Sequence, residues 1–174
     1  MKLNVGCGRT KLKGYINLDK RADFEPEICW DIESIPWCND TEEYFPHVIE
    51  DDTYDEIRMS HIVEHIKPWL IFDVIDEVWR VLKYGGPLTI FTPTAGSFRY
   101  FIDPTHCCPW TVGTPQFFNV DNPPMYYLYA PKPWVVSLTS IDAKGDIQIK
   151  MLKVNLERRD EALQKAKDII KKGK

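Results

Sequence analysis

The first nineteen residues constrain the fold of this chain more than any other stretch. An apolar run over residues 2–6 leads into a loop with glycines at 6, 8 and 14, and a second apolar run over 15–19 ends in Asp19. Two short strands would then place a bare glycine turn and a carboxylate at one edge of a sheet. Such an edge suits an adenosine-containing ligand, because glycines let the backbone approach closely and a carboxylate accepts hydrogen bonds from both ribose hydroxyls. The alternative is that Gly6 and Gly8 only make a turn.

The glycine loop does not match a dinucleotide site. The nicotinamide-type fingerprint G-x-G-x-x-G opens a helix whose N-terminus binds a pyrophosphate, and its acid follows about 20 residues later. Here Gly14 comes late, Asp19 comes early, and the gap between Gly6 and Tyr15 is short for a full crossover helix. A ligand without phosphate loses little when that helix is trimmed. S-adenosylmethionine is the common adenosine cofactor of this kind.

Alternating strand and helix patterns predict the rest of the fold. Short apolar runs bounded by turn residues predict strands over 28–32, 54–60, 87–92, 135–139 and 147–156. Residues 62–83 carry apolar side chains at spacings of three and four, which predicts a helix that Gly85 and Gly86 end. A charged helix is expected over 157–174. The pattern predicts one α/β domain over 1–174 with a parallel, doubly wound sheet.

Composition limits the possible functions. A chain of 174 residues with a net charge of −4 is expected to form one globular domain, and its acidity argues against a surface that tracks nucleic acid throughout. No apolar run approaches the roughly 20 residues of a membrane span, so we expect a cytoplasmic protein without membrane contact. Five cysteines without framework spacing predict reduced thiols. The acidic stretch 40–56 is expected to be a solvated loop.

Four motifs follow one another in a recognisable order. They are Leu-Asn-Val-Gly-Cys-Gly (3–8) with Gly-Tyr-Ile-Asn-Leu-Asp (14–19), Tyr-Asp-Glu-Ile-Arg-Met-Ser-His-Ile-Val-Glu-His-Ile (54–66), Glu-Val-Trp-Arg-Val-Leu-Lys-Tyr-Gly-Gly-Pro-Leu-Thr-Ile-Phe-Thr-Pro (77–93) and Asp-Pro-Thr-His (103–106). Together they resemble the motifs of small class I S-adenosylmethionine-dependent methyltransferases, over roughly residues 2–120. The resemblance implies a Rossmann-like, mostly parallel sheet of about seven strands with a C-terminal antiparallel hairpin. It also implies methyl transfer from S-adenosylmethionine.

The resemblance implies roles at the cofactor for individual residues. They are Asn4, Gly6, Cys7, Gly8, Asp19, Asp31, Ile32 and His61. In the resembled family the glycines contact the methionine moiety and ribose, the asparagine supports their loop, and the acid after the second strand holds the ribose hydroxyls. Asp31 and Ile32 match the positions beside the adenine, and His61 would lie at the cofactor edge. For Asp31, a solvated carboxylate at an ordinary strand end is the alternative.

Residues 95–134 are expected to cover the acceptor. Aromatic residues and prolines crowd this segment, which rules out one long helix and leaves an irregular lid or an aromatic satellite core. We favour a lid, because the segment follows a strand whose end should face the substrate. Within it, His106 is the candidate general base for an acceptor that must lose a proton, and Asp103 could orient it. Alternatively, His106 only hydrogen-bonds within its own loop.

Other motifs compete for the chemistry. His61-Ile-Val-Glu64-His65 is formally the H-x-x-E-H motif of zinc hydrolases, which requires both histidines on one helical face, whereas His61 is expected at a strand end. Asn-Pro-Pro-Met (122–125) lacks the aromatic residue with which nucleic-acid adenine methyltransferases stack a flipped base. Adjacent cysteines after His106 are poorly placed to chelate one ion. We therefore expect no metal site.

The sequence does not identify the methyl acceptor. Acidity favours a small molecule or a saccharide over nucleic acid, and oligomeric state is not predicted. The same fold can also serve a non-catalytic domain that binds S-adenosylmethionine or a partner.

Overall fold

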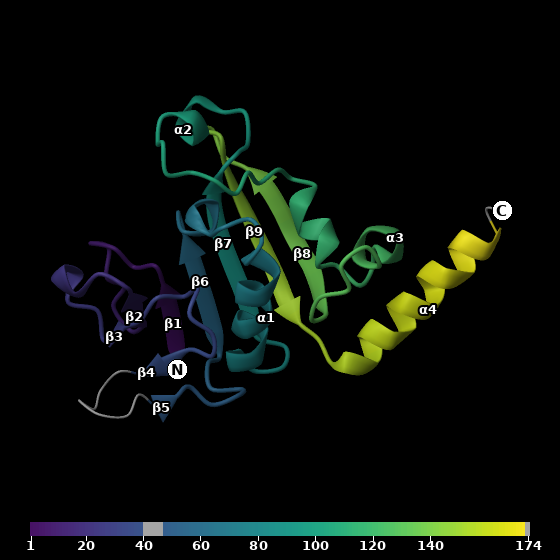
Figure 1. Ribbon diagram of the computed structural model, residues 1–174, viewed down its shortest axis with the longest axis horizontal. Helices are drawn as coiled ribbons and strands as arrows, with labels where there is room; N and C mark the ends of the chain where they lie inside the picture. Colours follow the sequence, from purple (N-terminus) through teal and green to yellow (C-terminus); the bar gives the residue numbers. More distant parts are fainter. Residues whose placement is uncertain (40–46, 173–174) are drawn as a thin grey trace.

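A mixed seven-stranded sheet forms the centre of the computed structural model, which describes residues 1–39 and 47–172 (Figure 1). Its strand order is β3-β2-β1-β6-β7-β9-β8. The strands are β1 (Lys2–Val5), β2 (Ile16–Asp19), β3 (Ile28–Cys29), β6 (Glu56–Ser60), β7 (Pro87–Pro93), β8 (Trp134–Ile141) and β9 (Asp146–Lys153). The first five run parallel, and β9 is antiparallel to both β7 and β8. This confirms the predicted sheet and its antiparallel C-terminal hairpin.

The remaining elements are short apart from two helices. A separate antiparallel pair is formed by β4 (Cys38–Asn39) and β5 (His47–Val48). The α-helices are α1 (Ile71–Val81), α2 (Phe98–Phe101), α3 (Pro123–Tyr126) and α4 (Leu156–Lys172). Three 3₁₀ turns cover Ala22–Phe24, Val63–His65 and Thr114–Phe117. Of the predicted acidic loop over 40–56, residues 40–46 lie outside the described residues, as do the last two residues of the predicted C-terminal helix.

The predicted helix over 62–83 is wrong in its first third. Residues 63–65 form a 3₁₀ turn instead, and α1 begins only at Ile71. Pro68 explains the break, because it has no N–H to donate and disfavours helical geometry at the residue before it. The helix also ends early, since Leu82 is already extended. Strand β9 likewise stops at Lys153 rather than 156.

The core lies between α1 and one face of the sheet. Val74, Ile75 and Val78 of α1 are fully buried in the same cluster as Met59 and Ile90 of the central strands. Figure 1 shows α1 lying across this face. The neighbouring positions of each strand point to the opposite face, which is polar. The alternation of apolar and polar residues along each strand therefore decides which face the helix covers.

The opposite face of the sheet carries charged side chains. Lys2 of β1 forms an ion pair with Glu56 of β6 at 2.8 Å, and Arg58 of β6 lies over the ring of Phe91 on β7 at 4.2 Å. Among the described residues, α1 is the only α-helix that connects two neighbouring parallel strands of the sheet, β6 and β7. The connections after β1 and β2 are loops, which agrees with the short gap seen in the sequence.

Residues 95–134 divide into two parts. The first part, which contains α2, projects beyond the carboxyl end of β7 (Figure 1). The second part, which contains Phe118 and Tyr129, packs beside α1. There Phe72 of α1 stacks on Tyr129 at 4.5 Å and lies 5.1 Å from Phe118. The aromatic satellite core thus accounts for the second part. A lid stays a prediction for the first part only.

No helix in the described ranges combines the length and apolar character that a membrane span requires. The five cysteines are free thiols.

Candidate functional site

A cavity of about 560 Å³ opens at the carboxyl ends of β1, β2 and β6, and we call it the β1–β6 cavity. The parallel sheet changes winding direction at β1, and open α/β sheets bind ligands at such a crevice. Six of the eight predicted cofactor residues line the cavity, namely Gly6, Gly8, Asp19, Asp31, Ile32 and His61. Residues from four separate segments of the chain therefore meet at one site.

Gly6 makes the turn that opens the cavity. Its φ of +67° lies in the left-handed region that favours glycine. A Cβ atom there would lie 2.6 Å from Cγ1 of Ile62, which also lines the cavity. The amide N–H groups of Gly6 and Cys7 both donate to the carbonyl of Leu18, at 2.8 and 3.0 Å. The close approach of this turn to Ile62, two residues after β6, thus requires glycine here.

Asp19 presents its carboxylate at the cavity edge. Its Oδ2 accepts a hydrogen bond from the N–H of Gly8 at 2.8 Å, and its Oδ1 accepts one from the N–H of Arg21 at 3.0 Å. Each oxygen keeps a further lone pair, because an ionised carboxylate offers about four acceptor sites. The backbone therefore fixes the carboxylate while leaving it able to accept two hydroxyl groups.

Asn4 and Cys7 lie beneath the loop and do not line the cavity. Asn4 is buried, and its Nδ2 donates to the Thr10 carbonyl at 3.2 Å and to Oδ1 of Asn17 at 2.9 Å. Asn17 in turn accepts from the N–H of Leu12 at 2.9 Å. Burial raises the pKa of the Cys7 thiol. Both residues can shape the loop, and their role at the cofactor stays a prediction.

The cavity wall also contains apolar residues that sequence reasoning missed. They are Phe24, Trp30, Ile62 and Ile66. Trp30 directly precedes Asp31, so the motif around the third strand could have pointed to it. Two cations at the rim are already paired, since Lys20 lies 3.7 Å from Asp31 and Arg21 lies 2.8 Å from Asp23. A ligand with a flat apolar ring and no phosphate suits these walls.

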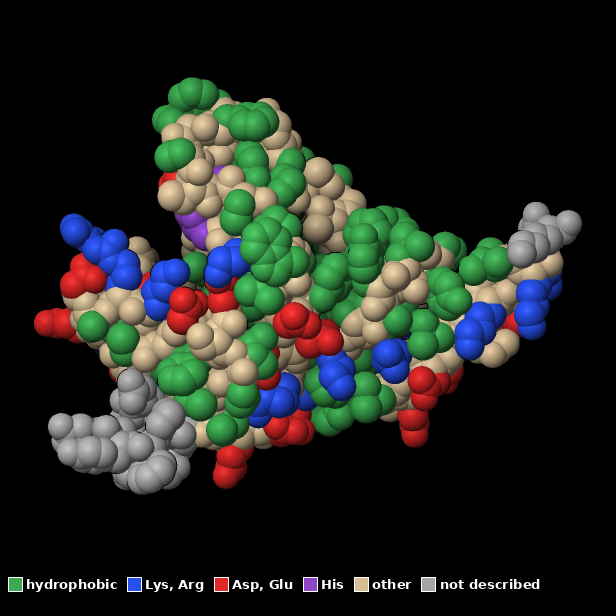
Figure 2. Space-filling model, viewed as in Figure 1, with side chains coloured by type: hydrophobic (Ala, Val, Ile, Leu, Met, Phe, Trp, Pro, Cys, Tyr) green, Lys and Arg blue, Asp and Glu red, His purple; other side chains and the backbone are tan. Residues whose placement is uncertain are grey.

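A second pocket of about 430 Å³ lies under α2 and shares His61 and His65 with the β1–β6 cavity; we call it the α2 pocket. Its other lining residues include Phe98, Arg99, Ile102, Asp103 and His106. Phe98 and Ile102 are 77% and 63% exposed, and Figure 2 shows hydrophobic side chains gathered on this projecting segment. The two hollows meet at the histidines, so ligands in them would be neighbours.

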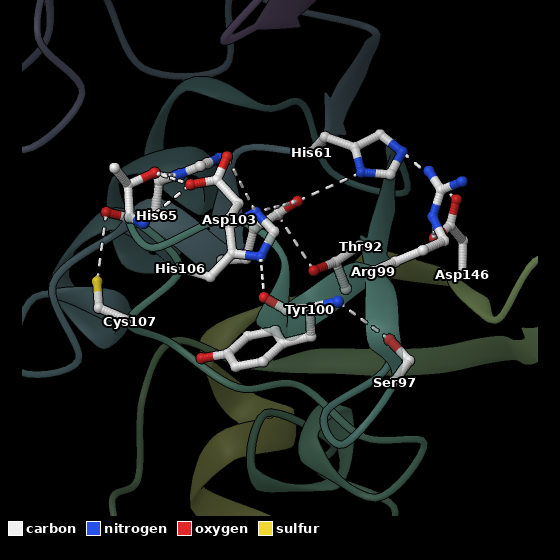
Figure 3. Close-up of polar contacts among 12 residues, drawn as sticks. His61, His65, Thr92, Ser97, Arg99, Tyr100, Asp103, His106, Cys107 and Asp146 are labelled. Atoms are coloured by element: carbon white, nitrogen blue, oxygen red, sulfur yellow. Dashed lines mark hydrogen bonds and ion pairs between the residues drawn. The ribbon is translucent and has the colours of Figure 1, made fainter.

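Glu64 is the residue of this region that sequence reasoning underrated. Its side chain is fully buried, and its Oε2 accepts from Oγ1 of Thr92 at 3.1 Å. Nδ1 of His61 lies 3.3 Å from Oε1, and this carboxylate raises the pKa of His61 (Figure 3). His61 has a φ of +54°, a strained value for a non-glycine residue, at the end of β6. No sequence signal shows this contact beyond the spacing of the two residues.

Asp103 and His106 both line the α2 pocket, but no hydrogen bond joins these two described side chains. Nδ1 of His106 lies 2.8 Å from the carbonyl of Tyr100, while its Nε2 is 4.0 Å from Oδ2 of Asp103 (Figure 3). Asp103 instead accepts from Oγ1 of Thr105 at 2.7 Å, and Thr105 lies 3.0 Å from Nδ1 of His65. Asp103 therefore acts on His65 through a threonine.

The H-x-x-E-H and Asn-Pro-Pro-Met motifs do not lie in the surroundings that their alternative functions require. Val63–His65 is a 3₁₀ turn, so His61 and His65 do not share the α-helical face on which the zinc-hydrolase motif depends. Asn122 precedes α3, whose Tyr126 is buried against Ala162 in a separate apolar cluster. The Asn-Pro-Pro-Met stretch lines neither hollow.

No protein-family model matches the chain, and no curated protein matches it. Solved structures do resemble it. An S-adenosylmethionine-dependent methyltransferase from Archaeoglobus fulgidus superposes with a TM-score of 0.56 at 21% identity, covering 87% of this chain and 85% of that chain. A methyltransferase from Methanosarcina mazei gives 0.58 at 15% identity, covering 88% and 92%. The 16S rRNA (adenine(1408)-N(1))-methyltransferase of Catenulisporales acidiphilia, as its W203A mutant, gives 0.58 at 13%, covering 88% and 84%. These likenesses confirm the fold that the motifs implied.

Proposed function

We propose that this chain binds S-adenosylmethionine in the β1–β6 cavity and transfers its methyl group to a small acceptor in the α2 pocket. The observation that carries the proposal is the Gly6 turn facing the Asp19 carboxylate, whose free lone pairs suit a ribose diol. The volume of about 560 Å³ falls within the usual range for ligand pockets. The solved structures that share this fold include several S-adenosylmethionine-dependent methyltransferases, which supports the proposal.

Each cofactor residue has a role in this proposal. Gly6 and Gly8 let the backbone approach the methionine and ribose, and Asp19 accepts hydrogen bonds from the ribose hydroxyls. Asp31 and Ile32 lie at the adenine end, where Trp30 adds an aromatic wall. His61 lies where the two hollows meet and would flank the methyl group. Asn4 and Cys7 support the loop from below.

The acceptor is proposed to be a small hydroxyl compound or saccharide. S-adenosylmethionine supplies a methyl carbon that bonds to the acceptor oxygen as its bond to sulfur breaks, leaving S-adenosylhomocysteine and releasing the hydroxyl proton. The α2 pocket is small, has apolar rims at Phe98 and Ile102, and has polar groups at its base. The α2 pocket would mainly align the acceptor oxygen with the methyl group of S-adenosylmethionine, and such alignment supplies much of the rate enhancement in displacements of this kind.

The role of His106 as a general base stays a prediction. A backbone carbonyl only accepts hydrogen bonds, so Nδ1 of His106 donates to Tyr100, and in the neutral ring Nε2 then carries the lone pair. This lone pair supports the prediction. Asp103 supports it less, because its hydrogen bonds go to Thr105 rather than to His106.

A transfer assay tests the proposal. The chain would be incubated with S-adenosylmethionine and three acceptor sets, namely hydroxylated small molecules, oligosaccharides and structured RNA, and S-adenosylhomocysteine would be measured by mass spectrometry. We expect product with a member of the first two sets, and a loss of rate of at least about tenfold in His106→Ala. Asp121→Asn, at an exposed carboxylate outside both hollows, is the control. Tight cofactor binding with no transfer to any set would instead favour a non-catalytic binding domain.

A further inference from the structure

Three side chains at the base of the α2 pocket gather possible metal-ligand atoms. One such atom from each of Glu64, His65 and His106 lies within 4.8 Å of the others. The rings of the two histidines meet edge to face, with centroids 4.7 Å apart (Figure 3). The group is reached from solvent through the α2 pocket, which all three residues line. Its members come from two segments of the chain, the turn after β6 and the loop after α2.

The buried carboxylate of Glu64 lacks a hydrogen-bond donor on one side. Oε2 accepts from Thr92, whereas the buried Oε1 makes no hydrogen bond within the ranges 1–39 and 47–172; Nδ1 of His61 lies 3.3 Å from it. Buried charges in proteins are normally paired or coordinate a metal ion. Nε2 of His106 lies 4.0 Å from Oε1, and in the neutral tautomer that carries its hydrogen on Nδ1 it offers a lone pair. A cation between these atoms would satisfy both.

Both histidines are held in the tautomer that binds a metal through Nε2. Nδ1 of His106 donates to the Tyr100 carbonyl at 2.8 Å. Thr105 gives its single hydroxyl hydrogen to Asp103, so it accepts from Nδ1 of His65 at 3.0 Å. Metal-binding histidines characteristically donate their other N–H to a carbonyl or to a carboxylate-linked group. The outer hydrogen bonds of a metal site are therefore already in place.

We infer that Glu64, His65 and His106 bind a divalent transition-metal ion, with Zn²⁺ as the best match. Two imidazoles and one carboxylate form a ligand set that zinc enzymes use, and the fourth position stays open. Imidazole disfavours Mg²⁺, which prefers oxygen ligands. This inference departs from the expectation of no metal site, because the sequence showed the H-x-x-E-H spacing but not the approach of His106 from the loop after α2.

His61 is the competing cation for Glu64. Its Nδ1 lies 3.3 Å from Oε1, and its Nε2 lies 3.6 Å from Asp146. A His61 cation would neutralise the carboxylate, but it would leave the two oriented Nε2 lone pairs without a partner. The metal ion accounts for all three groups together.

The ion would hold the acceptor oxygen at its open position. A bound metal lowers the pKa of a coordinated hydroxyl group and fixes its orientation. With the ion bound, Nε2 of His106 would be a ligand and the hydroxyl proton would pass to solvent water, so this arrangement would replace the general-base role proposed for His106 above. The role of the ion rests on the proposed methyl transfer, whereas binding of the ion does not.

Calorimetric titration of the chelator-treated full chain tests the site without S-adenosylmethionine present. Zn²⁺, Mn²⁺ and Mg²⁺ would each be titrated into the unmodified chain and into Glu64→Gln, His106→Gln, Thr105→Val and Cys107→Ser. We expect one equivalent of Zn²⁺ to bind, no binding of Mg²⁺, and affinity at least about 100-fold weaker in the first two variants. Thr105→Val, which removes the acceptor for His65, should lose roughly 10-fold to 100-fold. Cys107→Ser should bind normally, because this exposed thiol is a neighbour but not a member of the set.

Three results would overturn the inference: no Zn²⁺ binding, binding that both Glu64→Gln and His106→Gln leave unchanged, or binding lost in Cys107→Ser. If Glu64→Gln does not fold, His106→Gln decides, because circular dichroism and S-adenosylhomocysteine binding report its fold separately. If the unmodified chain did not bind S-adenosylhomocysteine, the proposed function would be refuted, while the result for the metal site would stand.

Discussion

At the scale of residues, Gly6 is the position where the cofactor edge tolerates least change. Gly6→Ala places a Cβ 2.6 Å from the side chain of Ile62 and holds alanine at a positive φ. The backbone strain alone costs about 1–2 kcal/mol, and a displaced Ile62 would enter the β1–β6 cavity. We expect S-adenosylhomocysteine affinity, measured by calorimetry, to fall at least about tenfold. Gly14→Ala is the matched control, because Gly14 has a φ of +83° but no atom near its Cβ position. Equal losses in both variants would argue against a close-approach role for Gly6.

Asp19→Asn tests the proposed ribose contact. Asparagine keeps one carbonyl oxygen to accept from the backbone, so the fold should persist, but the charge that strengthens hydrogen bonds from the hydroxyls is lost. Hydrogen bonds to charged groups contribute about 1.5–3 kcal/mol, which corresponds to a roughly 10-fold to 100-fold loss of affinity. Asp23→Asn, at the exposed partner of Arg21, should bind S-adenosylhomocysteine normally. An unchanged affinity in Asp19→Asn would remove the ribose assignment.

The sequence predicts some of these residues well and others poorly, for a physical reason. Gly6 and Asp19 belong to adjacent strands, so their meeting follows from local pattern alone. Glu64 meets Thr92 and His106 only through pairing of β6 with β7 and the path of the loop after α2. Asp103 turned toward Thr105 because its Asx-type contact is local and needs no tertiary partner. Long-range polar contacts of this kind have no spacing rule in the sequence.

At the scale of elements, α1 packs on the sheet and also carries Asp76, whose ionised form lowers the free energy of unfolding. Desolvation raises the pKa of Asp76 to about 6, although its Oδ1 accepts from the N–H of Lys132 at 2.7 Å. The folded state therefore binds more protons than the unfolded state between about pH 4 and 6. The contribution of Asp76 to stability falls as the pH rises through this window.

Asp76→Asn should remove this pH dependence. Asparagine keeps the acceptor for Lys132 without a charge to desolvate, so the variant should gain stability relative to the unmodified chain as the pH rises from 4 to 7. Urea unfolding at each pH measures the difference. Asp73→Asn, one turn earlier on α1 and exposed, should show no such trend. A stability difference that is constant with pH, or that favours the unmodified chain at pH 7, would contradict the account of Asp76.

The start of α1 at Ile71 could not be predicted from the apolar spacing of the sequence alone. Apolar periodicity extends through residues 62–66, but Pro68 and the buried turn around Glu64 override it. In this turn Glu64 and His65 lie beside His106 of the loop after α2, which is the arrangement on which the proposed metal site depends. The seven strands of the main sheet match the predicted runs apart from their ends, whereas the short β4–β5 pair is not predicted, and β5 lies within the stretch 40–56 expected to be a loop.

At the scale of the whole molecule, the candidate cofactor site lies at the carboxyl ends of the parallel strands β1, β2 and β6. Only one long helix, α1, packs on the sheet beside them. Loops and a short 3₁₀ turn follow β1 and β2, so within residues 1–39 and 47–172 the β1–β6 cavity is lined by loop residues, Ile62 and Ile66 and not by the N-terminus of an α-helix. The α-helix N-terminus that holds a pyrophosphate in dinucleotide sites is thus missing from this part of the described chain. We therefore propose that the cavity binds an adenosine ligand without phosphate.

Thermal unfolding with S-adenosylhomocysteine tests that claim most directly, with nicotinamide adenine dinucleotide as the matched control. At about 100 times its dissociation constant, the ligand should add roughly 2.7 kcal/mol to the free energy of unfolding, which raises the Tm of a chain this size by roughly 5–10 °C. The account predicts this rise with S-adenosylhomocysteine, none with the dinucleotide, and a much smaller rise in Gly6→Ala. No rise with S-adenosylhomocysteine, or an equal rise with the dinucleotide, would contradict it.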